Sequence, residues 1–261
     1  MSLERALSKL GLASRSQARA LIEAGRVTVD GRAITDPLKR VIPERISIAI
    51  DGARGTIVAP LTIALHKPRG YVTTRSDPEG RKTVYDLLDG LDVSVVPVGR
   101  LDLATSGLLL FTNDTQFANW LTDPASAIPR IYLVTAEGRI AEARRDQLVG
   151  GITSQDERLH AAAVVIRKAS NRETHLTVTL TEGKNREVRR LFEAIGHPVT
   201  QLRRVQFGGV ALGSLSPGSW RIVSEDELRA AFPAYEPGAR RRSRSSSRSR
   251  QHPASGTAKS R

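Results

Sequence analysis

The chain has 261 residues, contains no cysteine and carries a formal net charge of +13 at neutral pH. This length can bury a sizeable core, in one large or two unequal domains. The lack of cysteine excludes disulfides, thiolate metal sites and cysteine nucleophiles. The positive surplus favours a polyanionic partner, with nucleic acid as the first candidate. Because no apolar stretch is long enough to span a membrane and the first residues lack the apolar core of a secretory signal, we expect a cytoplasmic protein.

Residues 1–52 are expected to form a small RNA-binding domain of two helices and a short sheet. Regularly spaced leucines predict the first helix. Ser14 followed by Gln17 is a capping-box pattern that opens the second helix. Asp30 followed by Gly31 is typical of a tight β-hairpin turn. Apolar positions are few, so the predicted domain is small.

The cations of this domain lie outside its predicted apolar positions. Arg15, Arg19 and Arg26 gather with Lys9 around the helix pair and the entry to the first strand. Such a cluster suits an RNA phosphate backbone, although an ordinary solvated face has the same composition. The stretch SRSQARALIEAGRVTVDGR at 14–32 also resembles the small RNA-binding domain named after a primary-binding protein of the small ribosomal subunit. In that family the helix pair and the turn contact structured RNA.

The remaining chain divides into a linker, a large domain and a tail. We expect the linker at 53–60 and the large domain at 61–233, which contains many strands and a few helices. Since strands and helices do not alternate regularly, the pattern predicts an α+β fold with helices flanking a mostly antiparallel mixed sheet. The basic Arg/Ser-rich tail at 234–261 has almost no apolar residue, so we predict disorder there. Non-specific RNA affinity and a solvated tail without function are both open.

A single carboxylate stands out in GRLDLATSGLLLF, residues 99–111. Asp102 lies in a short polar turn between two apolar runs that are typical of buried strands. A rigid sheet would then present this carboxylate to a pocket. Beside Arg100, an ionised Asp102 suits the role of a nucleophile or a base. The structural alternative is a turn-capping residue paired with Arg100.

A second group of polar residues lies in LTEGKNREVRRLF, residues 180–192. A helical pattern there brings together four cations, Lys184, Arg186, Arg189 and Arg190. So dense a cluster repels itself unless anions are close, and a phosphate backbone or a buried carboxylate would relieve the repulsion. A basic helix face without a special role is the alternative. The chain has no dinucleotide fingerprint, phosphate loop or histidine cluster of metal-binding type.

Four motifs follow one another in an order and spacing that resemble the pseudouridine synthases of the RsuA/RluB type. They are HKPRGYVTTRSDPEGR at 66–81, GRLDLATSG at 99–107, PRIYLVTAEG at 129–138 and EGKNREVRRLFEAIGHPV at 182–199. The resemblance extends to about residue 230 and is strongest to the large-subunit branch, RluB. It implies an enzyme that breaks the N-glycosidic bond of a uridine in RNA, rotates the base and rejoins it through C5. No cofactor and no metal would take part.

The resemblance also implies a set of catalytic residues. Asp102 matches the catalytic aspartate of the family; attack on the sugar C1′, addition to C6 of the base and abstraction of a sugar proton all stay open. Arg189 matches the arginine that pairs with this aspartate, with Arg186 as the second candidate. Tyr132 matches the tyrosine that packs against the target base, although a tyrosine covering the sheet core is a fair alternative.

Other matching residues would contact the RNA. Arg100 matches the arginine that fills the gap left by an extruded base. Arg130 stands where many relatives have lysine, a change that keeps the charge and leaves the contact of this residue open. The remaining cations expected to bind RNA are Lys67, Arg69, Lys184, Arg186 and Arg190, together with Arg15, Arg19 and Arg26 of the small domain.

Ribosomal RNA, or a ribosomal assembly intermediate, is the expected partner of a monomeric enzyme. Large-subunit (23S) ribosomal RNA is the favoured substrate. Two alternatives stay open: a synthase that acts on small-subunit (16S) ribosomal RNA, and a non-catalytic RNA-binding protein of ribosome assembly.

Overall fold

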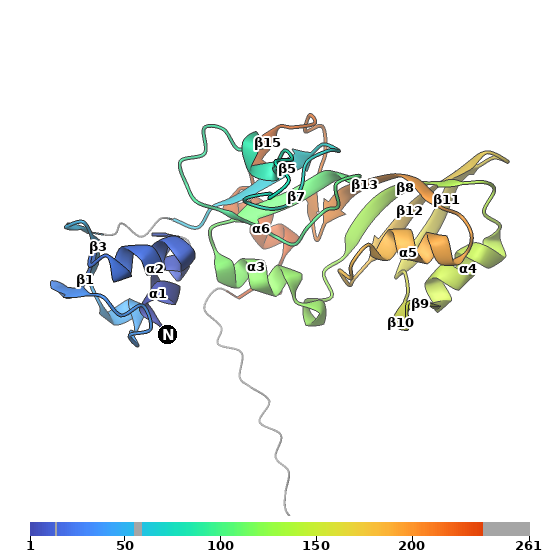
Figure 1. Ribbon diagram of the computed structural model, residues 1–261. Coiled ribbons are helices and arrows are strands. Elements are labelled where there is room, and N and C mark those ends of the chain that lie inside the picture. Colours follow the sequence, from blue (N-terminus) through green and yellow to red (C-terminus); the bar gives the residue numbers. More distant parts are fainter. Residues whose placement is uncertain (14, 55–58, 237–261) are drawn as a thin grey trace, which may run out of the picture.

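The computed structural model describes residues 1–13, 15–54 and 59–236 (Figure 1). At the N-terminus, two helices pack on a four-stranded antiparallel sheet of order β2-β1-β3-β4. The elements are α1 (Leu3–Lys9), α2 (Arg15–Glu23), β1 (Val27–Val29), β2 (Arg32–Ile34), a 3-10 turn η1 (Pro43–Arg45), β3 (Ile48–Ile50) and β4 (Ala53–Arg54). The predicted pair of helices and the small sheet are therefore confirmed.

The predicted hairpin turn forms between β1 and β2. Asp30 and Gly31 have φ angles of 51° and 78°, the left-handed conformation that a tight two-residue hairpin turn requires. Strand β4 lies within the segment 53–60 that the sequence assigned to a linker. The predicted cap Ser14 and residues 55–58 of that segment lie outside the described residues, as do residues 237–261 of the tail.

The large domain is an α+β structure built on a nine-stranded mixed sheet, as the sequence predicted. The main strand order is β11-β12-β8-β13-β7-β5-β15, with β14 paired to β13 and β6 paired to β7. The strands are β5 (Thr62–Lys67), β6 (Val96–Pro97), β7 (Ser106–Thr112), β8 (Arg130–Glu137), β11 (Ala163–Ala169), β12 (Glu173–Leu180), β13 (Val199–Phe207), β14 (Val210–Ala211) and β15 (Trp220–Ile222).

Helices and a small hairpin complete the large domain. Its helical elements are η2 (Val84–Leu87), α3 (Thr115–Thr122), η3 (Pro124–Ser126), α4 (Glu142–Gly150), α5 (Glu187–Ala194) and α6 (Glu225–Ala231), and the hairpin consists of β9 (Ile152–Ser154) and β10 (Glu157–Leu159). Leu109 and Phe111 of β7 enter one apolar cluster, whereas Leu108 and Leu110 enter a second cluster with α3. The alternation of side chains along β7 thus joins two cores.

One parallel pairing connects the two halves of this sheet. Strands β7 and β13 pair in parallel, with Arg204 opposite Gly107, and every other strand pair assigned among the described residues is antiparallel. Gly107 has a φ of 110°, and a Cβ atom there would overlap the backbone carbonyl oxygen of Arg204. Only glycine combines this backbone conformation with so close an approach. Gly107, five residues after Asp102, therefore permits this junction.

We expect Gly107→Ala to destabilise the large domain by about 3 kcal/mol, because it adds both backbone strain and a steric clash at the junction. Chemical denaturation followed by circular dichroism measures this change. Gly90→Ala is the matched control: Gly90 also has a positive φ, of 77°, but a Cβ atom there meets nothing within 4 Å. Equal unfolding free energies for the two variants would contradict the close-approach argument.

Candidate active site

Asp102 lies in the turn between β6 and β7, at the junction of the two halves of the sheet. The Thr105 amide donates to the Asp102 carbonyl at 3.0 Å, and the Gly70 amide donates to the Leu103 carbonyl at 2.9 Å. These bonds close the turn and attach it to the segment that follows β5. The Asp102 side chain keeps 34% of its surface exposed. The turn therefore holds its backbone rigidly and leaves the carboxylate open to a ligand.

Arg189 of α5 faces this carboxylate, as the resemblance implied. Its Nε lies 4.0 Å from Oδ2 of Asp102. The other guanidinium nitrogens donate to backbone carbonyls, at 3.0 Å to Val199 and at 3.3 Å to Ala104. Burial lowers the pKa of Arg189, with a further contribution from the Arg186 cation. Arginine still keeps its charge at neutral pH, so Arg189 presents a fixed cation to Asp102.

Lys67 holds the Asp102 turn from inside the protein. Its side chain is fully buried, and its ammonium donates to the carbonyls of Pro68, Asp102 and Thr105 at 3.0, 3.1 and 2.8 Å. This position corrects the prediction that Lys67 binds RNA phosphates, because all three of its donors are directed at backbone carbonyls. Lys67 is the last residue of β5, in which every residue is buried.

A cavity of about 130 Å³ opens beside the Asp102 turn. Its walls include Arg100, Asp102, Tyr132, Lys184 and Arg186, so the structure brings these five predicted site residues together. Tyr132 is only 8% exposed and also belongs to the apolar core. It therefore combines the two positions that the sequence left as alternatives: a wall of the cavity and a part of the sheet core.

Two buried arginines that line the same cavity were not predicted as site residues. Arg130 and Arg204, on the neighbouring strands β8 and β13, lie 4.9 and 5.1 Å from the ring centre of Phe207. Arg130 also donates to four backbone carbonyls, those of Leu121, Ile128, Thr181 and Glu182. It thereby ties the end of α3 to the loop that leads into α5. Arg130 begins β8, and Arg204 lies in β13, whose sequence VTQLRRVQF mixes polar and apolar residues, so the pattern gave no signal that these arginines are buried.

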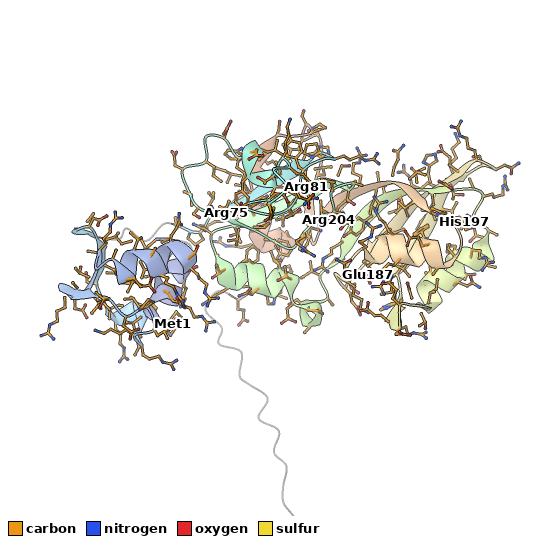
Figure 2. All side chains as sticks on the ribbon, viewed as in Figure 1. Met1, Arg75, Arg81, Glu187, His197 and Arg204 are labelled. Atoms are coloured by element: carbon orange, nitrogen blue, oxygen red, sulfur yellow. The ribbon has the colours of Figure 1, made fainter. Side chains whose placement is uncertain are left out.

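Glu187 lies beside this pair, at the start of α5. Its side chain is 4% exposed and accepts a hydrogen bond from the Lys184 amide at 3.2 Å. Burial raises the pKa of the Glu187 carboxyl, and Lys184 and Arg130 offset part of this rise. Glu187 and Arg204 both lie near the middle of the large domain in Figure 2, and both line the same cavity.

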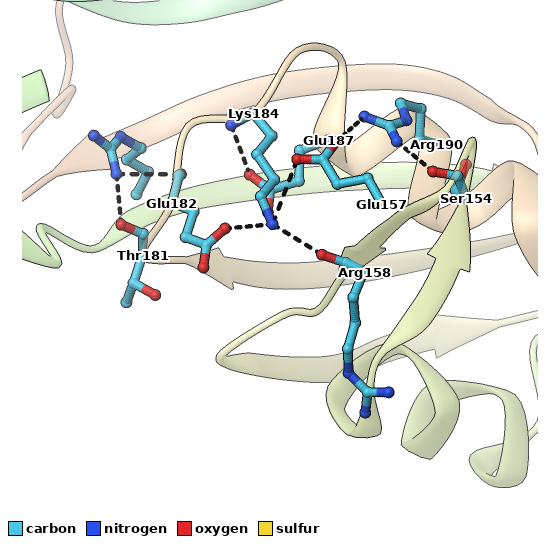
Figure 3. Close-up of polar contacts among 9 residues, drawn as sticks. Ser154, Glu157, Arg158, Thr181, Glu182, Lys184, Glu187 and Arg190 are labelled. Atoms are coloured by element: carbon cyan, nitrogen blue, oxygen red, sulfur yellow. Dashed lines mark hydrogen bonds and ion pairs between the residues drawn. The ribbon is translucent and has the colours of Figure 1, made fainter. Parts of the chain in front are cut away.

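Lys184 and Arg190 belong to an ionic network with the β9–β10 hairpin (Figure 3). The Lys184 ammonium lies 2.7 Å from Glu182 and 3.6 Å from Glu157. Arg190 binds the other carboxylate oxygen of Glu157 at 2.8 Å and also donates to the Ser154 carbonyl. These anions relieve the repulsion that the sequence indicated. Arg190, 9% exposed, thus joins α5 to the hairpin instead of facing solvent as an RNA-binding cation would.

The other predicted RNA-binding residues are exposed. Arg69 donates to the Thr200 carbonyl at 3.3 Å and lies outside the cavity walls. In the small domain, Arg15 and Arg19 share the buried carboxylate of Glu4, at 3.7 and 2.9 Å. Arg26 forms a two-point ion pair with the exposed carboxylate of Asp51, which lowers the pKa of that carboxyl. None of these four side chains reaches Asp102 in a contact that the structure shows.

No group of three or more His, Cys, Asp or Glu side chains among the described residues is arranged to hold a metal ion. No helix in the described ranges combines the length and apolar character needed to cross a membrane.

Lys67 gives the site a testable pH dependence. Burial lowers the pKa of this ammonium from 10.5 to about 8. The folded protein therefore releases the proton near pH 8, whereas the unfolded chain keeps it to about pH 10.5. Between pH 8 and pH 10.5 the unfolded chain binds one proton more than the folded protein, so the unfolding free energy rises with pH. We expect the wild type to gain about 3 kcal/mol over this range relative to Lys67→Met. Denaturation curves at pH 7.5 and 10.5 measure the difference. A difference in unfolding free energy between the two proteins that does not change with pH would contradict this account.

Comparisons with known proteins identify the family. A model described as RNA pseudouridylate synthase matches residues 62–194, and one described as S4 domain matches residues 1–44. An "Uncharacterized RNA pseudouridine synthase" of Aquifex aeolicus is 36% identical over 244 residues, which cover 92% of this chain and 98% of the relative. The "Ribosomal large subunit pseudouridine synthase B" of Salmonella typhimurium is 38% identical over 225 residues, covering 84% of this chain and 77% of the relative.

A solved structure agrees with these sequence matches. A crystal structure titled as a pseudouridylate synthase superposes with a TM-score of 0.61 at 26% identity, covering 88% of this chain and 98% of that chain. The family that the four sequence motifs resembled is thereby confirmed. The chain belongs to the RNA pseudouridine synthase family and is an enzyme of that family with an S4 domain at its N-terminus.

Proposed function

We propose that this enzyme converts a specific uridine of large-subunit (23S) ribosomal RNA to pseudouridine, with Asp102 as the catalytic carboxylate and without a cofactor. The observation that carries the proposal is the position of Asp102: its exposed carboxylate faces the buried Arg189 guanidinium at 4.0 Å beside a cavity that Tyr132 also lines. The Salmonella relative, which is named for the large ribosomal subunit, supports the choice of substrate.

The proposed reaction is an isomerisation, so all atoms are conserved. The bond from N1 of uracil to C1′ of the ribose breaks, the base rotates, and C5 bonds to C1′. The proton on C5 is then lost and N1 gains a proton. Attack on C1′, addition to C6 and abstraction of a sugar proton each use an ionised carboxylate, and the Arg189 guanidinium lies 4.0 Å from Asp102 as its partner of opposite charge.

The residues around Asp102 receive roles from their positions. Tyr132 packs against the target base within the cavity and serves the proton transfer at C5. Arg100 is exposed at the cavity wall, where its side chain is free to enter the space that the extruded uridine vacates. The exposed Arg69 and Arg186 and the rim residue Lys184 contact phosphates on either side of that uridine.

The small domain provides further RNA contacts in this proposal. Arg15, Arg19 and Arg26 are exposed, and each would exchange its carboxylate partner for a phosphate group of the RNA. We place the enzyme in the cytoplasm, acting as a monomer on ribosomal RNA or on an assembly intermediate.

We expect Asp102→Asn to lower the rate of pseudouridine formation by a factor on the order of 1,000, because the amide cannot act as nucleophile or base. The affinity for RNA should change little, since the substitution keeps the size of the side chain. A single-turnover assay and a filter-binding titration with the same RNA measure the two quantities. Asp92→Asn, at an exposed carboxylate near the preceding loop, is the control. A fully active Asp102→Asn enzyme would remove this residue from the mechanism.

Mapping pseudouridines in ribosomal RNA from cells with and without the gene tests the substrate. A uridine in 23S RNA that loses its modification supports the proposal. A lost site in 16S RNA would support the small-subunit alternative, and an unchanged map with defective ribosome assembly would favour a non-catalytic RNA-binding protein.

A further inference from the structure

A basic hollow lies on the small domain, away from the arginines of α2. Its volume is about 500 Å³, and it opens between the β1–β2 hairpin and the segment that leads to β3. Apolar side chains of Val29, Val41 and Ile46 line it together with the exposed Ile42. The other lining residues are Asp30, Arg32, Lys39, Arg40 and Arg45.

Backbone hydrogen bonds fix the shape of this hollow. The amides of Leu3 and Glu4 donate to the carbonyls of Lys39 and Pro37 at 2.9 and 3.1 Å. The Val41 amide donates to the Met1 carbonyl at 2.8 Å, and the N-terminal ammonium donates to the Val41 carbonyl at 2.8 Å. The segment that carries Lys39 and Arg40 is thus attached to the first turn of α1. A ligand would therefore meet a preformed surface.

The cations of the hollow form no ion pair with a carboxylate that the structure describes. Arg32, Lys39, Arg40 and Arg45 are all exposed, and none of them has an ion pair with a described carboxylate. The one acidic side chain in the lining, Asp30, accepts a hydrogen bond from the Ser47 amide at 2.8 Å. By contrast, Arg15, Arg19 and Arg26 are each within 4 Å of a carboxylate, which an RNA phosphate would have to displace.

An apolar side chain completes the surface. Ile42 is 53% exposed at the wall of the hollow, where it presents a hydrophobic surface among the cations. Cations beside an apolar surface match the two parts of a nucleotide: phosphates that bind cations, and a base or ribose that packs on apolar atoms. An acidic protein segment would supply the negative charges, but its side chains would not regularly provide a group that packs on Ile42.

We propose that this hollow binds an unpaired stretch of the substrate RNA, with phosphates at Arg40 and Arg45 and a nucleoside against Ile42. The inference rests on the proposed function, because it takes the ribosomal RNA substrate as the ligand. It assigns the small domain a second RNA-binding face, formed by the hairpin and the segment 39–46. Since these cations have no ion pair with a described carboxylate to exchange, this face supplies most of the salt-dependent affinity of the small domain.

The test uses the full chain and protein-free, in vitro transcribed 23S RNA. The double variant Arg40→Gln/Arg45→Gln should bind this RNA about tenfold more weakly, and the slope of log affinity against log salt should fall by about 1.5. Arg139→Gln/Arg172→Gln, at exposed residues that follow β8 and precede β12, removes the same net charge as a control. Equal slopes for the two double variants would overturn the proposal.

A second pair of variants tests the apolar contact. Ile42→Ser should weaken RNA binding a few-fold without changing the salt slope, because it removes apolar surface and no charge. Leu38→Ser is the matched control, since Leu38 is 62% exposed and lies outside the walls of the hollow. Equal affinities of the two variants would contradict the contact with a nucleoside. A wild type that binds but does not modify the RNA would instead count against the proposed function alone.

Discussion

The close approach of β7 to β13 is the constraint on which the rest of the large domain depends. These strands pair in parallel where Gly107 lies against the backbone of Arg204, and the pairing joins the two halves of the sheet. The Asp102 turn leads directly into β7, and α5, which carries Arg189, leads into β13. Joining these strands therefore brings together a carboxylate and a guanidinium that are 87 positions apart in a chain of 261 residues.

Around this junction, buried cations are solvated mainly by backbone carbonyls. Lys67 donates to three carbonyls, Arg130 to four, and the Nε of Arg204 to that of Leu108 at 2.7 Å. Burying these charges costs free energy, which the carbonyl dipoles offset in part. In return, loops without regular secondary structure are held at defined positions. The Asp102 carboxylate keeps its freedom to react because its turn is held through the backbone, by Lys67.

Turn signals and apolar runs are local features, so they predicted the fold class and the Asp102 turn, whereas Tyr132 and Arg100 were assigned to the site through the resemblance to the family. The prediction that Lys67 binds RNA was wrong, because Lys67 ends a strand that is buried on both faces. Polar and apolar residues do not alternate in such a strand, so the pattern does not show that Lys67 is buried. The prediction also failed for Arg190, which is adjacent to Arg189 in the sequence but points to another side of α5, toward the β9–β10 hairpin. Contacts with that hairpin depend on tertiary packing, which local patterns do not encode.

The central claim is that a guanidinium held by backbone carbonyls keeps the Asp102 carboxylate in a reactive position. Arg189→Lys tests it most directly, because lysine keeps the positive charge and cannot reproduce the paired donors to Val199 and Ala104. The measurement is the single-turnover rate of pseudouridine formation with RNA in excess of its dissociation constant. The account predicts a rate about 100-fold lower with nearly unchanged RNA affinity. A wild-type rate for Arg189→Lys would contradict it.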